Sequence, residues 1–133
     1  MPASTEVERV TKERIGQDIF RASLEDYWGG RCPITGIGDR ALLRASHTKP
    51  WAVCDNDEER LDVYNGFLLT AHLDAAFDAA LMTFDNDGAI LLSSKLTEKA
   101  TALLILGADR VRISDSHKPY LAHHLERFRK GIG

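Results

Sequence analysis

The sequence predicts an α+β fold centred on a β-β-α unit at residues ~41–81. Two short apolar runs, 41–46 and 66–70, have the length and the leucine and phenylalanine content of strands. The segment 71–81 follows the second run directly and is rich in alanine and other good helix formers. A polar loop at 52–64, with room for one helical turn, joins the two strands.

A long helix is predicted at ~6–28, because apolar residues recur there every three to five positions. The pair Gly29-Gly30 is a typical helix stop. Residues 31–38 contain Pro33 and two glycines, which suit a tight turn better than a helix. The β-β-α unit is therefore expected to begin after an N-terminal helix and a turn.

The C-terminal part, ~82–130, is predicted to hold a hairpin and helices. Residues 82–93 have two apolar runs around a turn at 85–88, and Thr97 can cap a helix that ends before Gly107. Residues 110–113 alternate like a short strand, and Pro119 opens a final helix to about 130. Since no repeat or linker is visible, residues 1–133 are predicted to form a single domain.

Composition favours a soluble globular protein, with 44% apolar and 28% charged residues. No apolar run approaches the roughly 20 residues that a membrane-spanning helix needs, and the start of the chain lacks a signal-peptide pattern. Cys32 and Cys54 lie far apart, without the paired spacing of a structural zinc site or the number of a disulfide scaffold. The expected compartment is a reducing cytoplasm, with no membrane partner.

The distribution of charge is more informative than the net charge of −3. An acidic total weakly disfavours a nucleic-acid partner, because such domains usually carry excess Lys and Arg. Residues 31–51, however, are locally basic, which is compatible with a polyanion held there. Arg44, Lys49 and Arg60 are the candidates for contacts to phosphates.

Two acids and a histidine suggest metal-assisted phosphodiester hydrolysis. Asp74 and Asp78 lie four residues apart, so on a helix both carboxylates project from one face and can approach one cation. Hard oxygen ligands of this kind suit Mg²⁺ or Mn²⁺ better than Zn²⁺. His47, at the end of the first apolar run, has an ordinary pKa near 6.5 and is suited to take a proton from water at neutral pH.

Four blocks of sequence, taken together and in this order, resemble the HNH endonucleases, in particular the branch found in restriction and phage-defence nucleases. The blocks are Tyr27–Gly36, Leu42–Trp51, Asn65–Leu69 and Asp74–Asp78. Gln17–Arg21 upstream and Tyr120–His124 downstream also fit, so the resemblance covers most of the chain. The resemblance implies a ββα-metal core with flanking helices and a hairpin, one divalent cation, and cleavage of DNA, most naturally duplex DNA. It assigns His47 as general base and Asn65 as the residue that pins the loop holding that histidine. Asp74 and Asp78 then fall at the helix positions that contribute metal ligands.

Two positions depart from the family pattern. Ser46 stands where many members place an Asp or His ligand, so it is at most a weak third ligand. Ala80 stands where a glycine is more usual. The cysteine pairs that bind zinc in other branches are missing, so no structural zinc is predicted.

The leading hypothesis is a metal-dependent DNA endonuclease with little sequence recognition of its own, directed by a fused or partner targeting domain or by a homodimer. Ser46 motivates an alternative, an HNH-fold nucleic-acid-binding module without catalysis. The negative net charge motivates a third, a hydrolase of small phosphate esters. DNA versus RNA preference stays open at this stage.

Overall fold

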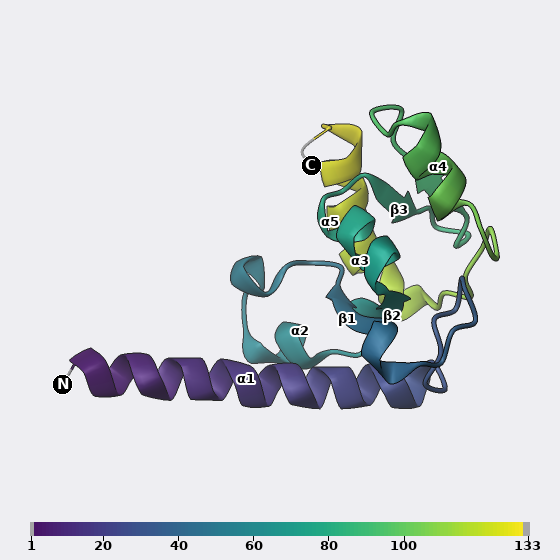
Figure 1. The fold of residues 1–133 in the computed structure, drawn as a ribbon. Coiled ribbons are helices and arrows are strands. Elements are labelled where there is room, and N and C mark those ends of the chain that lie inside the picture. The colour runs from purple at the N-terminus through teal and green to yellow at the C-terminus, as the bar shows by residue number, and fades with distance from the viewer. Residues whose placement is uncertain (1, 132–133) are drawn as a thin grey trace.

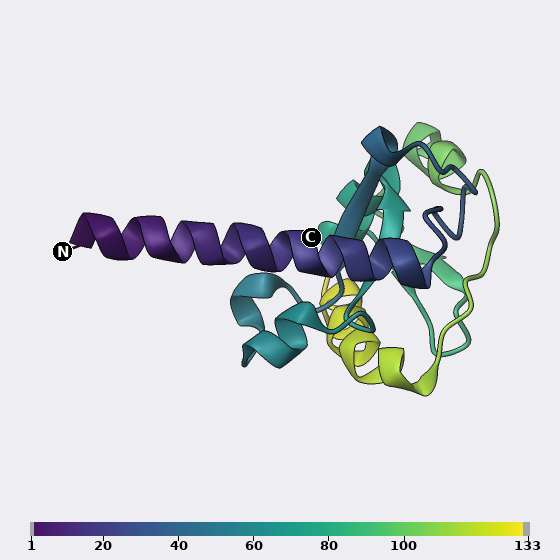
Figure 2. The same cartoon turned by 90° about the horizontal axis from the view of Figure 1, so that it is seen from below.

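The computed structural model describes residues 2–131, and its most extended element is the first helix, α1 (Pro2–Tyr27). The N-terminal turns of α1 extend beyond the rest of the domain, whereas its C-terminal half packs against the strands (Figure 1, Figure 2). The helix ends where Gly29 and Gly30 take left-handed backbone angles, with φ of 67° and 70°. The predicted glycine stop is therefore confirmed. None of the described helices has the length and apolar character needed to span a bilayer.

The predicted β-β-α unit is present. Strands β1 (Leu43–His47) and β2 (Gly66–Thr70) pair antiparallel, with His47 opposite Gly66, and α3 (Ala71–Asp78) follows β2 directly. Helix α1 covers one face of this hairpin and α3 covers the other. Because both faces are covered, every residue of β2 is buried. A short 3₁₀ turn, η1 (Arg40–Leu42), precedes β1, which therefore begins two residues later than predicted.

Helix α3 ends before the predicted boundary because of the backbone at Ala80. This residue has φ of 56°, a left-handed angle that favours glycine, and it is the alanine that replaces the more usual glycine. The amides of Ala80 and Leu81 donate to the carbonyls of Phe77 and Ala76, which closes the last turn. The chain thus accepts local strain at this helix end.

The loop between the strands carries a 3₁₀ turn, η2 (Trp51–Val53), and a short helix, α2 (Asp57–Leu61). The side chain of Asn56 caps α2 by accepting from the amide of Glu59 at 2.9 Å. The helical turn predicted in this loop is therefore confirmed. Helix α2 packs against the middle of α1.

The C-terminal part contains the predicted hairpin, β3 (Met82–Phe84) with β4 (Ile90–Leu92), and α4 (Glu98–Leu104), capped by Thr97. A 3₁₀ turn, η3 (Asp115–His117), leads into α5 (Lys118–Arg129). The strand predicted at 110–113 is wrong. That segment lies against the β3–β4 turn and makes a single bridge, Ala89 with Arg110, so no ladder forms.

One apolar cluster joins α1, both hairpins, α3 and α5. Its large fully buried members are Phe20, Leu24, Leu43, Phe67, Leu68, Leu69, Leu73, Phe77, Met82, Phe84 and Leu121. Five of these eleven side chains come from β2 and α3, the two elements that meet without an intervening loop. The β-β-α unit is thus held at the centre of the core, and its position does not depend on its own small sheet.

His124 of α5 is a polar member of this core. Its ring is fully buried, stacks on Phe77 with centroids 3.9 Å apart, and lies 2.8 Å from the Thr83 hydroxyl. Its Nε2 donates to the Phe77 carbonyl at 2.6 Å, so in the neutral ring Nδ1 accepts from Thr83. Burial lowers the pKa of His124 to about 4.

The buried His124 predicts a loss of stability in mild acid. Its folded-state pKa lies below the ordinary value near 6.5, so between these values the unfolded chain binds the extra proton. Stability should be fully present above about pH 6.5 and should fall toward pH 4, by on the order of 3 kcal/mol from this group. Urea unfolding at about pH 7 and about pH 4.5 measures the difference.

The variant His124→Gln should show a smaller difference between the two pH values, whereas His123→Gln, a half-buried neighbour on α5, should keep most of it. The buried His117, whose pKa burial also lowers, accounts for part of the remaining slope. Equal slopes for His124→Gln and the unchanged protein would contradict the assignment.

Candidate active site

Ser46 and Asp74 meet between β1 and α3. The Ser46 hydroxyl donates to Oδ1 of Asp74 at 2.5 Å, and Asp78 lies one helical turn further along α3. Asp74 is half-buried and Asp78 is exposed. Burial raises the pKa of Asp74 and the charge of Asp78 adds to this, whereas the Ser46 hydrogen bond and the Arg44 charge oppose it.

This donor set fits a hard divalent cation. It offers two carboxylates and a hydroxyl, all of them oxygen ligands, and the mutual repulsion of the carboxylates would be relieved by a cation between them. Within residues 2–131 no three His, Cys, Asp or Glu side chains converge as metal ligands. Ser46, Asp74 and Asp78 would therefore hold a cation together with water, which is how Mg²⁺ is usually bound, and not as a closed protein cage.

His47 lies on the other face of the hairpin, toward α1, because successive side chains of a strand point to opposite faces. Its imidazole stacks on Phe20, with ring centroids 3.7 Å apart and an interplanar angle of 13°. The edge contact with Trp51 has centroids 5.7 Å apart. No hydrogen bond joins His47 to Asp74 or Asp78 in the described part of the chain. The two halves of the predicted site are instead adjacent along β1, since Ser46 and His47 are consecutive.

The surroundings of His47 fix which nitrogen is free. Nε2 lies 2.8 Å from the carbonyl oxygen of Arg60, and a carbonyl only accepts, so Nε2 carries the hydrogen. In the neutral ring the lone pair is then on Nδ1, which has no hydrogen-bond partner among residues 2–131 and is not among the buried unpaired atoms there. Burial lowers the pKa of His47, only partly offset by the Arg60 carbonyl. The result is a neutral imidazole whose basic nitrogen is unpaired and not fully buried.

Asn65 is fully buried and ties together three parts of the loop. Its Oδ1 accepts from the Lys49 amide at 2.7 Å. Its Nδ2 donates to the carbonyls of Lys49, at 3.2 Å, and Glu59, at 3.1 Å, and approaches the Cys54 sulfur at 3.5 Å. These bonds hold the segment that carries the Arg60 carbonyl, and so the partner of His47.

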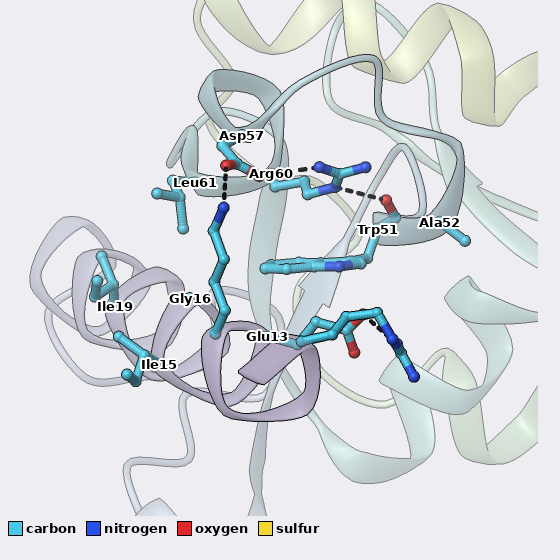
Figure 3. A pocket seen from close by; sticks show the side chains of 11 residues that line it. Glu13, Ile15, Gly16, Ile19, Trp51, Ala52, Asp57, Arg60 and Leu61 are labelled. Atoms are coloured by element: carbon cyan, nitrogen blue, oxygen red, sulfur yellow. Dashed lines mark hydrogen bonds and ion pairs between the residues drawn. The ribbon is translucent and has the colours of Figure 1, made fainter. Parts of the chain in front are cut away.

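The three basic candidates differ sharply in their surroundings. The Lys49 ammonium forms ion pairs with Glu59 at 2.9 Å and Asp55 at 3.3 Å, and its side chain is only 16% exposed. The Arg60 guanidinium donates to Asp57 and to the carbonyls of Trp51 and Cys54. Arg60 lies beside the Trp51 ring (Figure 3). Both residues line a cavity of about 490 Å³ between α1 and the loop. The Lys49 and Arg60 side chains are thus engaged in holding the loop.

Arg44 is exposed and has no ion pair within the described chain. Its Nη1 donates to the carbonyls of Ala41 and Leu43, and its charge reaches Asp74. It lies two residues before Ser46 in β1, and so on the face that carries the acids. Among the three candidates, Arg44 is the one whose guanidinium has no ion pair in the described chain and whose Nε and Nη2 make no hydrogen bond there.

Sequence reasoning did not single out three residues that border this site. Phe20 and Trp51 contact His47, and Arg127 of α5 donates to the Asp78 carbonyl at 2.9 Å, at the C-terminal end of α3. Phe20 and Arg127 are far from the motif in sequence, and an apolar or basic residue in a helix carries no sign of such a contact. Trp51 lies four residues after His47, at the end of a block that carries the family resemblance, and this was the available signal.

Comparisons with known proteins support the assignment of the central unit. A search of curated proteins found no match. A protein-family model described as HNH endonuclease matches residues 32–85. This segment contains β1, the loop, β2 and α3, with Ser46, His47, Asn65, Asp74 and Asp78. Residues 32–85 are therefore similar to the HNH endonucleases, a family of nucleases.

Proposed function

We propose that this protein is a divalent-metal-dependent endonuclease that hydrolyses phosphodiester bonds in DNA. The observation that carries the proposal is a pair of adjacent residues on β1 with complementary chemistry. Ser46 joins the carboxylate Asp74 on one face, and His47 presents a free basic nitrogen on the other. In this proposal a phosphate at this end of the hairpin lies between a cation held by the acids on one face and the proton acceptor on the other.

His47 is proposed as the general base. The Arg60 carbonyl holds the hydrogen on Nε2, so Nδ1 takes the proton from the attacking water. Because burial keeps the pKa below its ordinary value, the ring is neutral and able to accept at neutral pH. Asn65 acts through the loop, by holding the backbone near Arg60 in place.

Asp74, Asp78 and Ser46 are proposed to hold one Mg²⁺ or Mn²⁺ ion. When bound, such an ion supplies positive charge that stabilises the developing charge on the phosphate and the leaving oxygen. Arg44 is proposed to contact a phosphate beside it. Lys49 and Arg60, engaged with acids and carbonyls, are better assigned to the structure of the loop than to DNA contacts.

Further details remain predictions from the sequence. The resemblance predicts a role in restriction or phage defence. The cytoplasmic location is predicted from the two unpaired cysteines, and target choice through a fused or partner domain or a homodimer from the lack of a recognisable base-reading element. The inactive binding module stays the alternative, because the described chain offers only two carboxylates and a hydroxyl for the ion.

The catalytic proposal predicts metal-dependent nicking of a plasmid that His47→Ala abolishes. Loss of a general base should slow cleavage by roughly 10²–10⁴-fold, whereas DNA binding should persist. The assay compares Mg²⁺, Mn²⁺ and EDTA, and His72→Ala serves as the matched control on α3. Purified protein that binds DNA and cuts it with none of the divalent ions would favour the inactive module.

The metal proposal predicts that Asp78→Asn weakens Mg²⁺ or Mn²⁺ binding by about tenfold or more, because it removes one of two charged ligands. Isothermal titration calorimetry on the free protein measures this without reference to activity. Asp87→Asn, an exposed acid in the β3–β4 turn, should bind like the unchanged protein. Equal loss in both variants would indicate diffuse attraction by net charge.

The DNA-contact proposal predicts that Arg44→Gln weakens DNA binding and lowers the slope of log affinity against log salt by about 1, as loss of one phosphate contact should. Lys49→Gln should instead lower the melting temperature and leave that slope nearly unchanged, because Lys49 is held by Glu59 and Asp55. Arg112→Gln, an exposed arginine near the β3–β4 turn, is the control for charge alone. A slope unchanged by Arg44→Gln would remove this residue from the interface.

A further inference from the structure

Helix α1 lies outside the segment that matches the HNH family model, yet it supplies the ring that stacks on His47. Phe20 is fully buried, and its ring lies nearly parallel to the imidazole at a centroid distance of 3.7 Å. Stacking at this distance fixes the plane of the imidazole, because rotation about the ring's own torsion would drive it into Phe20.

A glycine on β2 makes room for this stack. Gly66 pairs with His47 across the hairpin, so its side-chain position lies beside the imidazole. A Cβ built at Gly66 would lie 2.5 Å from Cζ of Phe20 and would also collide with the Ser46 carbonyl. The Phe20 ring therefore occupies space that any other residue at position 66 would fill.

A glycine on α1 makes room for the second ring. A Cβ at Gly16 would lie 2.7 Å from the tip of the Trp51 indole, at Cη2, so the indole lies directly on the helix backbone (Figure 3). Trp51 contacts the imidazole edge at an interplanar angle of 82°, and its carbonyl accepts from Nε of Arg60 at 3.1 Å. The same Arg60 accepts from His47 through its own carbonyl. The imidazole is thus held by one face contact, one edge contact and one hydrogen bond.

We propose that Phe20 is a positioning residue for His47 and that α1, through Phe20 and Gly16, is part of the catalytic unit. This inference rests on the proposed role of His47 as general base. Without the stack the imidazole turns away from the Arg60 carbonyl, and Nδ1 no longer keeps one direction. A misplacement of about 1 Å in a reacting group costs on the order of 10²-fold in rate, so the effect belongs in kcat and not in binding of DNA.

The test compares Phe20→Leu with Phe84→Leu. Both remove a fully buried ring by the same change, but Phe84 contacts Phe67 and Phe77 and makes no ring contact with His47. Phe20→Leu should lower kcat for plasmid nicking by roughly 10- to 100-fold with KM little changed. Phe84→Leu should lower the melting temperature and keep kcat.

Nitrogen-15 spectra of the His47 ring, recorded where histidines are neutral, provide a readout that does not depend on cleavage. The unchanged protein and Phe84→Leu should show mainly the Nε2–H form, and Phe20→Leu a mixture of both forms. A Phe20→Leu variant that keeps both kcat and the Nε2–H form would overturn the proposal. If no variant cuts DNA, the nuclease assignment fails, and the spectra still decide whether Phe20 positions the ring.

Gly16→Ala tests the same positioning of His47 from the side of α1, without removing a buried ring. Alanine is favoured over glycine inside a helix by about 1 kcal/mol, so α1 itself should become more stable. The added Cβ must nevertheless displace Trp51 from the imidazole edge. We expect kcat to fall by roughly threefold to tenfold with no drop in melting temperature. An unchanged kcat would show that α1 does not act on His47 through Trp51.

Discussion

The arrangement of the candidate site depends on the register of the β1–β2 hairpin. Because successive side chains of a strand point to opposite faces, Ser46 points toward α3 and His47 toward α1. A shift of β1 by one residue against β2 would exchange the faces to which they point. The register is strongly specified because β2 is buried on both faces, so a shifted strand would misplace every apolar contact of Phe67, Leu68 and Leu69. The burial of apolar side chains in β2 therefore supplies the free energy that fixes the register of the hairpin. This register in turn determines where Ser46 and His47 lie.

The loop between β1 and β2 positions the hydrogen-bond partner of His47. It must hold the Arg60 carbonyl against His47 although α2 is only five residues long. A single buried amide, Asn65, satisfies backbone groups of Lys49 and Glu59, and the ion pair between those two residues closes the same loop from outside. Leaving any of these buried groups unpaired would cost about 1–3 kcal/mol, so the loop is held in one conformation. Basic residues near a candidate site can thus stabilise a loop conformation instead of binding a ligand, as Lys49 and Arg60 do.

The sequence predicted those parts of the fold that local patterns determine. Apolar runs and helix propensity predicted the bounds of β2 and the start of α3, and the pair Gly29-Gly30 predicted the end of α1. The prediction of a strand at residues 110–113 was wrong, because an alternating pattern alone does not provide a neighbouring strand to pair with. Within the site, the spacing of Asp74 and Asp78 predicted their shared face of α3. The stack of Phe20 on His47, 27 positions apart, could not be predicted, because packing between distant segments leaves no periodic signal.

The negative charges of Asp74 and Asp78 are not neutralised by basic side chains of the described chain. Asp74 is half-buried with a second carboxylate one turn away, and this costs stability that an alanine at either position would not. The Ser46 hydroxyl and the Arg44 charge offset only part of that cost, and Arg44 forms no ion pair with Asp78 in the described chain. A structural role would be better served by closing the pair with a lysine or arginine, as the loop does for Glu59 and Asp57. Acids left open beside one free arginine are instead the arrangement expected where a cation and a phosphate are to bind together.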